Sequence, residues 1–157
     1  MDFNTNIFTK FDKEWALLAA GTPDDHNAMT VSWGGMGTLW SKPVVTVYVR
    51  HSRHTFGYIE NNEYFSLSFY PEEYRKALGV MGSKSGRDCD KDALAGLTPA
   101  AAGKSVSYKE AKTTLVCKKL YSGELGPDGI PEEVKAACYA DNDYHRMYIG
   151  EVVEIID

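Results

Sequence analysis

Short segments with the patterns of β-strands recur along most of this 157-residue chain, and they constrain its fold more than any other feature. Residues 44–49 are rich in β-branched side chains, which predicts a buried strand. Residues 64–69 alternate strictly, so Phe65, Leu67 and Phe69 are expected on one face of a second strand. Further strands are predicted at residues 15–20, 28–33, 113–117 and 147–156.

The helical signals are fewer and shorter. Pro71 precedes two glutamates, an arrangement typical of a helix start because acidic residues suit the positive end of the helix dipole. Apolar residues follow at helical spacing from Tyr74 to Met81. Gly79 or Gly82 is the expected end of this helix.

Two more short helices are predicted. One follows Pro131, with Val134, Ala137 and Cys138 on its apolar face. The other follows Thr55, which is the expected N-cap.

Many short strands with a few short helices between them predict a mainly β protein. A small closed or partly closed antiparallel barrel fits this pattern, because closure removes exposed strand edges. The chain has the length of one ordinary domain and contains no internal repeat and no linker rich in proline, glycine or serine. Residues 1–157 are therefore interpreted as a single domain.

Charge and cysteine content argue against several classes of protein. The formal net charge of -5 disfavours a general nucleic-acid binder, because phosphate-driven affinity needs a basic face. No apolar run approaches the roughly 18–20 residues of a membrane span, and the first residues lack the pattern of a signal peptide. Cys89, Cys117 and Cys138 are too widely spaced for a disulfide framework or a zinc site. We expect a cytoplasmic protein with reduced thiols that binds neither nucleic acid nor membrane.

The first segment that suggests chemistry is a polar strand followed by glycines. Thr30 and Ser32 are expected on one face of the strand, and Met29, Val31 and Trp33 on the other. Three glycines come next: Gly34, Gly35 and Gly37. They are expected to form a turn whose backbone N–H groups approach a phosphate or the edge of a heteroaromatic ring. An ordinary strand and turn is the alternative.

The second segment follows the strand at residues 44–49. Two arginines, a serine and a threonine lie within six residues: Arg50, Ser52, Arg53 and Thr55. Arginine presents a fork of donors that matches phosphate, and a helix start adds backbone amides. An anion site is one interpretation, and a solvated basic turn is the other. His51 and His54 are not interpreted as metal ligands, because no third ligand lies at a suitable spacing.

The third segment, residues 82–91, combines glycines, serines and three basic residues. This composition is typical of phosphate-binding loops, but the spacing is not that of a P-loop. A flexible surface loop is the alternative, in which Asp88 and Asp90 pair with Arg87 and Lys91. Exposed pairs of that kind stabilise a protein little.

Strings from all three segments occur in a fixed order: Asn27-x-Met29-Thr30-x-Ser32-Trp33, Lys42-Pro43, Val49-Arg50-x-Ser52-Arg53-x-Thr55 and Ser85-Gly86-Arg87-Asp88-x-Asp90-Lys91. Together they resemble the flavin-reductase-like, or flavoredoxin-like, FMN-binding split barrels. The string from Asp143 to Glu151 is also typical of the last strand of that family. The resemblance extends from about Trp15 to Glu151, which is nearly the whole chain.

The resemblance implies a mainly β fold, an FMN-binding split β-barrel of Greek-key type with a few short peripheral helices. It also implies a homodimer with FMN near the dimer interface. The cofactor-binding residues that it implies are Asn27, Met29, Thr30, Val31, Ser32, Trp33, Arg50, Ser52, Arg53, Thr55, Ser83, Ser85, Gly86, Arg87, Lys91 and His145. Among these, the second segment is expected to approach the phosphate, Trp33 to pack near the ring or ribityl chain, and His145 to lie near the isoalloxazine.

Two other residues are left with open alternatives. Trp40 either stacks near the flavin or belongs to the core. Cys89 lies within the third segment, so it either approaches the flavin or is an ordinary packed or surface thiol. Some members of the family have a cysteine near the position of Met81, and its absence here weakens a thiol-based redox role.

The implied activity is that of an FMN-dependent oxidoreductase of the NAD(P)H-linked flavin reductase type. Hydride is expected to pass from NADH or NADPH to bound FMN, and on to a flavin, an iron chelate or another acceptor. The alternative is a flavoredoxin-like electron-transfer protein that serves a protein partner and reacts little with nicotinamides. A binding module on the same scaffold without flavin is the third hypothesis. No catalytic side chain and no metal are assigned, because the flavin carries the chemistry.

Overall fold

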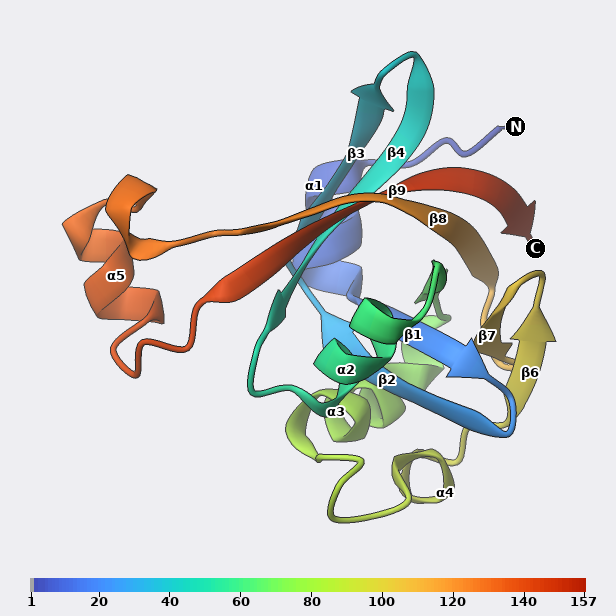
Figure 1. Ribbon diagram of the computed structural model, residues 1–157. Coiled ribbons are helices and arrows are strands. Elements are labelled where there is room, and N and C mark those ends of the chain that lie inside the picture. The colour runs from blue at the N-terminus through green and yellow to red at the C-terminus, as the bar shows by residue number, and fades with distance from the viewer. Residues whose placement is uncertain (1) are drawn as a thin grey trace.

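The structure of this protein is a computed structural model that describes residues 2–157. Seven strands form one antiparallel sheet in the order β2-β1-β5-β8-β9-β4-β3, and β6 and β7 form a separate small sheet (Figure 1). The strands are β1 (Ala16–Thr22), β2 (Asp25–Val31), β3 (Gly34–Leu39), β4 (Lys42–Arg50), β5 (Tyr64–Phe69), β6 (Pro99–Ala102), β7 (Ser105–Tyr108), β8 (Thr113–Glu124) and β9 (His145–Ile156). The prediction of a mainly β protein with short helices is confirmed.

Strand β3 lies where the sequence predicts a glycine-rich turn, so that prediction is wrong. Gly34 pairs with Val47 of β4 as part of a regular antiparallel ladder. A Cβ atom at Gly34 would lie 2.5 Å from the ring of Phe11. This glycine therefore permits close packing of a core aromatic ring rather than close approach of a ligand.

Alternation along the strands divides the interior into two cores. In β5, Phe65, Leu67 and Phe69 all point into the main core, as predicted, and are at most 1% exposed. In β1, Leu18 joins the main core while Leu17 faces a second core. Helix α3 and strand β7 cover this second face of β1 and supply half of the buried residues of the second core.

The helices are short and lie around the sheet. They are α1 (Ile7–Thr9) with a following π-helical turn (Lys10–Glu14), α2 (His54–Asn61), α3 (Arg75–Ser83), α4 (Lys91–Ala95) and α5 (Glu132–Cys138). Short 3₁₀ turns precede α3 (Glu72–Tyr74) and α5 (Pro127–Gly129). Among residues 2–157, no helix is long and apolar enough to cross a membrane.

Two predicted helix boundaries are wrong. Helix α3 continues through Gly79 and Gly82, because neither glycine adopts the left-handed conformation of a C-terminal cap. A Cβ atom at Gly82 would lie 3.1 Å from Thr30, so this glycine lets α3 pack closely on β2. Helix α2 begins at His54 with Arg53 as its N-cap, and Thr55 is fully buried inside its first turn.

The predicted helix after Pro131 is present as α5, but its apolar face is not buried in this chain. None of its residues is buried, and Val134 is 38% exposed. Figure 1 shows α5 at the far end of a long arm formed by β8 and β9. Tyr121 and Leu125, at the β8 side of this arm, are also exposed.

Candidate functional site

A cavity of about 240 Å³ lies where β2, the start of α2, the end of α3 and the loop before α4 meet. It brings together Asn27 of the first segment with most of the second and third segments. The residues that line it are Asn27, Ser52, Arg53, His54, Thr55, Ser83, Lys84, Ser85, Arg87, Asp88 and Lys91. We call it the cationic cavity.

Backbone carbonyl groups hold the three principal cations of this cavity. Arg53 Nη1 donates to the carbonyl of Gly82 at 2.9 Å, and Lys91 Nζ donates to the carbonyl of Met81 at 2.9 Å. Both acceptors lie at the C-terminal end of α3, where the helix dipole is negative. Arg87 Nη1 donates to the carbonyl of Ser52 at 2.9 Å. Within residues 2–157, no carboxylate forms an ion pair with any of these three cations.

The pKa shifts around this cavity have the signs expected of crowded cations. Burial, reinforced by the charge of Arg53, lowers the pKa of Lys91 to about 8. Burial also lowers the pKa of Arg53. The pKa of His54 is lowered by burial and then by the charges of Arg87 and Lys91. An anion bound here would oppose all of these shifts, because a nearby negative charge favours the protonated form of each group.

Asn27 and Gly86 fix one wall of the cationic cavity. Asn27 is 7% exposed, and its Nδ2 donates to Oγ1 of the fully buried Thr55 at 2.7 Å. A Cβ atom at residue 86 would lie 2.2 Å from Asn27 Oδ1 and 3.0 Å from His54 Cδ2. Only glycine fits at this position without displacing its neighbours.

The serines of the cavity have different partners. Ser83 Oγ donates to the carbonyl of Gly79 at 2.8 Å, within helix α3. Ser85 Oγ accepts from the backbone N–H of Arg87 at 3.2 Å. Ser52 Oγ donates to Asp143. The hydroxyl protons of Ser83 and Ser52 are therefore engaged within the protein, whereas that of Ser85 is available.

A second cavity of about 190 Å³ adjoins the first along β2. It is lined by Met29, Thr30, Val31, Ser32, Trp33, Tyr48, Arg50 and His145. The rings of Trp33 and His145 are 5.4 Å apart, and Trp33 is 49% exposed. We call this the aromatic cavity, because the rings of Trp33, Tyr48 and His145 belong to its lining.

His145 is neutral at pH 7. Its Nδ1 shares a hydrogen bond of 2.7 Å with the hydroxyl of Tyr139, and the residue is 7% exposed. Burial, and then the charge of Arg50, lowers the pKa of His145 to about 4. The aromatic cavity therefore offers a neutral imidazole to a ligand.

The spacing of the two cavities suits one elongated ligand. Asn27 lines the cationic cavity and Met29 lines the aromatic cavity, two residues further along β2. Successive residues of a strand rise about 3.3 Å, so these positions are roughly 7 Å apart. A molecule with an anionic group at one end and a planar ring at the other can reach both.

The predicted site residues divide between the two cavities, with some differences from expectation. Arg50 does not line the cationic cavity with the other residues of the second segment. Its Nη1 donates to the carbonyl of Asp143 at 2.6 Å, and its Nη2 donates to that of Cys138 at 2.8 Å. The hydroxyl of Thr30 donates to the carbonyl of Leu78 at 2.5 Å, so it holds α3 against β2.

Met29 and Val31 line the aromatic cavity and also contribute apolar surface to the main core. Gly86 borders the cationic cavity through Asn27 and His54.

Trp40 does not belong to the core, and it lines neither of the two cavities. It is 63% exposed at the β3–β4 turn, where its φ of 51° is left-handed. Cys89 lines neither of the two cavities, and its thiol donates to the carbonyl of Ser85 at 3.5 Å.

Several residues of the site were not predicted from the sequence. His54, Lys84 and Asp88 line the cationic cavity, and Tyr48 lines the aromatic cavity. His54 and Lys84 adjoin predicted residues in the chain, so proximity was an available signal. Nothing local indicates Tyr48, whose position follows from the pairing of β4 with β9.

Comparison with known proteins bears on the same residues. The Flavin reductase like domain family matches residues 8–156 of this chain. A search of curated proteins finds none that matches this sequence.

Solved structures share the fold. Flavoredoxin from Methanosarcina acetivorans is 22% identical, with a TM-score of 0.73 over 100% of this chain and 74% of that one. An FMN-binding protein from Thermus thermophilus, solved with p-hydroxybenzaldehyde, is 18% identical, with a TM-score of 0.73 over 99% and 78%. A Shewanella frigidimarina protein with a split barrel domain is 19% identical, with a TM-score of 0.70 over 92% and 67%.

The likeness to these structures concerns the fold, and it confirms the split barrel that the sequence strings imply. The family match covers all three polar segments and the last strand. This chain belongs to the flavin reductase like domain family.

Proposed function

We propose that this protein binds FMN, with the phosphate in the cationic cavity and the isoalloxazine in the aromatic cavity. One observation carries the proposal: Arg53, Arg87 and Lys91 surround a cavity, and within residues 2–157 none of them has a carboxylate partner. A phosphate dianion supplies the missing negative charge and accepts several hydrogen bonds. The FMN-binding protein from Thermus thermophilus shares the fold and supports this choice of ligand.

The proposed activity is that of an oxidoreductase in which NADH or NADPH reduces the bound flavin. When bound, FMN supplies the hydride and electron chemistry. The chain itself binds the phosphate, orients the ring beside Trp33 and presents the neutral His145. The aromatic cavity is open on its outer side, where Trp33 is half-exposed, so a planar reductant has a path to the ring.

An anaerobic absorption experiment tests the proposal. Purified protein mixed with FMN should show a visible flavin spectrum after free flavin is removed. Bleaching on addition of NADH or NADPH supports the reductase. Bound FMN that neither nicotinamide bleaches supports the electron-transfer alternative, with a protein partner as reductant. Protein that retains no FMN refutes flavin binding and leaves the binding module without flavin.

We also propose that the protein acts as a homodimer, with the arm of α5 packed on a second copy. An isolated seven-residue helix is marginally stable in water, yet α5 buries none of its residues within this chain. Tyr121, Leu125 and Val134 give the arm exposed apolar surface. Light scattering on the purified protein should give twice the mass of the chain, and a monomeric mass would refute the dimer.

A further inference from the structure

Lys91 enters the cationic cavity from a helix that cannot fix its own position. Helix α4 contains only five residues, Lys91–Ala95, and helices this short are marginal by themselves. Asp90 caps its N-terminus, accepting from the backbone N–H of Ala93 at 3.0 Å, and Gly96 ends it with a φ of 69°. These caps shape the helix but do not attach it to the sheet.

The position of Lys91 is also unfavourable for its charge. Its side chain is 4% exposed, and the ammonium group is close enough to Arg53 to be repelled by it. One carbonyl, that of Met81, holds the ammonium group in place. Contacts elsewhere on α4 therefore have to keep the helix where it is.

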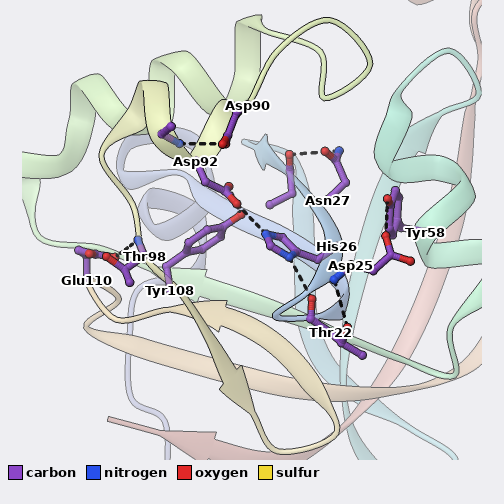
Figure 2. A network of polar contacts seen from close by, with 12 residues as sticks. Thr22, Asp25, His26, Asn27, Tyr58, Asp90, Asp92, Thr98, Tyr108 and Glu110 are labelled. Atoms are coloured by element: carbon purple, nitrogen blue, oxygen red, sulfur yellow. Dashed lines mark hydrogen bonds and ion pairs between the residues drawn. The ribbon is translucent and has the colours of Figure 1, made fainter.

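Asp92, the next residue of α4, supplies that attachment. Figure 2 shows its carboxylate between His26 of β2 and Tyr108 of β7. His26 Nε2 lies 2.7 Å from Oδ2, and the Tyr108 hydroxyl donates to Oδ1 at 2.7 Å. Because each carboxylate oxygen has its own partner on a different strand, Asp92 has little freedom to rotate.

The two partners of Asp92 are themselves fixed. His26 Nδ1 lies 2.9 Å from the carbonyl of Thr22, as Figure 2 also shows. The ring of Tyr108 is 3% exposed within the second core and meets the His26 ring edge-on at 6.0 Å. The hydrogen bond with Asp92 raises the pKa of His26. Burial opposes the charge of Asp92, but hydrogen bonds from His26 and Tyr108 outweigh it and lower its pKa. Both shifts favour the charged forms of His26 and Asp92.

We infer that Asp92 is a positioning residue: clamped by His26 and Tyr108, it fixes α4 so that Lys91 stays in the cationic cavity and can bind a phosphate group. This inference rests on the proposed binding of FMN. It assigns the clamp to the phosphate end of the ligand alone, since none of its three residues lines the aromatic cavity.

FMN and riboflavin differ only in the phosphate, so their relative affinities test the inference. The dissociation constants of both flavins are measured by fluorescence quenching at pH 6.5 for wild type, Asp92→Ala and Tyr108→Phe. We expect Asp92→Ala to weaken FMN binding about tenfold and Tyr108→Phe roughly threefold, because hydrogen bonds to a charged group are lost. The affinity for riboflavin should stay within about twofold of wild type.

Tyr148→Phe is the matched control. Tyr148 is fully buried and its hydroxyl donates to a carboxylate, Glu60, at 2.6 Å, but it lies outside both cavities. Its removal should lower the unfolding temperature as Tyr108→Phe does, without changing the affinity ratio of the two flavins. The mild Tyr108→Phe change also keeps the test valid if Asp92→Ala fails to fold.

A double-mutant cycle with Lys91→Met shows whether the clamp acts through Lys91. In that background, Tyr108→Phe should have no further effect on FMN affinity. The same threefold loss in both backgrounds would overturn the inference, as would an equal loss for both flavins or no loss in either variant. Wild-type protein that does not prefer FMN over riboflavin would overturn the proposed phosphate site as well, so the two failures are distinguishable.

Discussion

Raising the pH from 7 to 9 should weaken FMN binding, because Lys91 loses its proton in the free protein over this range. Burial and the neighbouring Arg53 lower the pKa of Lys91 to about 8. A phosphate dianion beside the ammonium group would raise that pKa again, since opposite charges favour the charged form. Above pH 8, FMN binding therefore includes the uptake of one proton, and the affinity falls as protons become scarce.

The magnitude follows from the pKa of Lys91. About nine-tenths of the free protein carries a charged Lys91 at pH 7, and about one-tenth does at pH 9. The dissociation constant of FMN should therefore rise about tenfold, which corresponds to about 1.4 kcal/mol. The arginines of the cavity stay charged over this range, and the phosphate, with a second pKa of about 6, is already a dianion. The lowered pKa of His54 leaves that residue neutral above pH 7.

Fluorescence titrations at pH 7, 8 and 9 measure this effect, with riboflavin as the ligand that lacks the charge. Lys91→Arg supplies the matched protein, because its guanidinium remains charged throughout and should give a flat profile. A constant FMN affinity in wild type from pH 7 to 9 would refute the reasoning. So would an equal slope in Lys91→Arg.

Three further predictions concern single residues. Gly86→Ala should weaken FMN binding and lower the unfolding free energy by about 1–3 kcal/mol, because the added Cβ would displace Asn27 from its buried hydrogen bond with Thr55. The control is Gly79→Ala, whose added Cβ would meet no atom within 4 Å. Ser41→Gly should stabilise the protein by about 1 kcal/mol, as it removes a left-handed φ of 58° from a residue with a side chain, and a lower unfolding temperature would contradict this. His145 should remain neutral in the folded protein down to about pH 5, because burial and then the charge of Arg50 lower its pKa to about 4. Below pH 6.5 the unfolded chain binds a proton at this histidine that the folded protein does not, so the stability falls as the pH falls. NMR resonances of His145 that titrate between pH 6 and 7 would contradict this prediction.

The strands of this fold are largely predictable because their signal is local. Alternation places Phe65, Leu67 and Phe69 on one face, and the structure buries all three. The failures occur where tertiary contacts override local preference. Gly34 is predicted to be a turn residue, yet it lies in strand β3, where the absence of a side chain lets the Phe11 ring pack against its backbone. Gly82 is predicted to end a helix, yet it lies inside α3, where Thr30 packs against it.

Without the resemblance to a known family, the residues of each segment predict the site only through their composition. The segments that contain Arg53 and Arg87 each allow a solvated loop as well as an anion site, and neither segment reveals that they share a cavity. The clamp on Asp92 is a clearer case, since His26 is 66 residues away in the chain. No sequence spacing predicts that contact, because it arises from the packing of α3 against β2 and of α4 against α3.

The unpaired cations also link binding to stability. Lys91 has a lower pKa in the folded protein than the ordinary 10.5, so its charged form destabilises the folded state at pH 7. Lys91→Met keeps an apolar stem of similar length and removes the charge. In the absence of FMN it should raise the unfolding temperature by roughly 2–4 °C, or about 1 kcal/mol once solvent screening in the cavity is allowed for. Excess FMN should make wild type the more stable of the two proteins. At a ligand concentration of 100 times its dissociation constant, binding adds about 2.7 kcal/mol to the unfolding free energy of wild type, and it adds less to that of the variant, which binds FMN more weakly. Thermal melts with and without FMN measure both effects. If the variant is less stable than wild type without FMN, the ammonium group of Lys91 stabilises α4, and the reasoning is wrong.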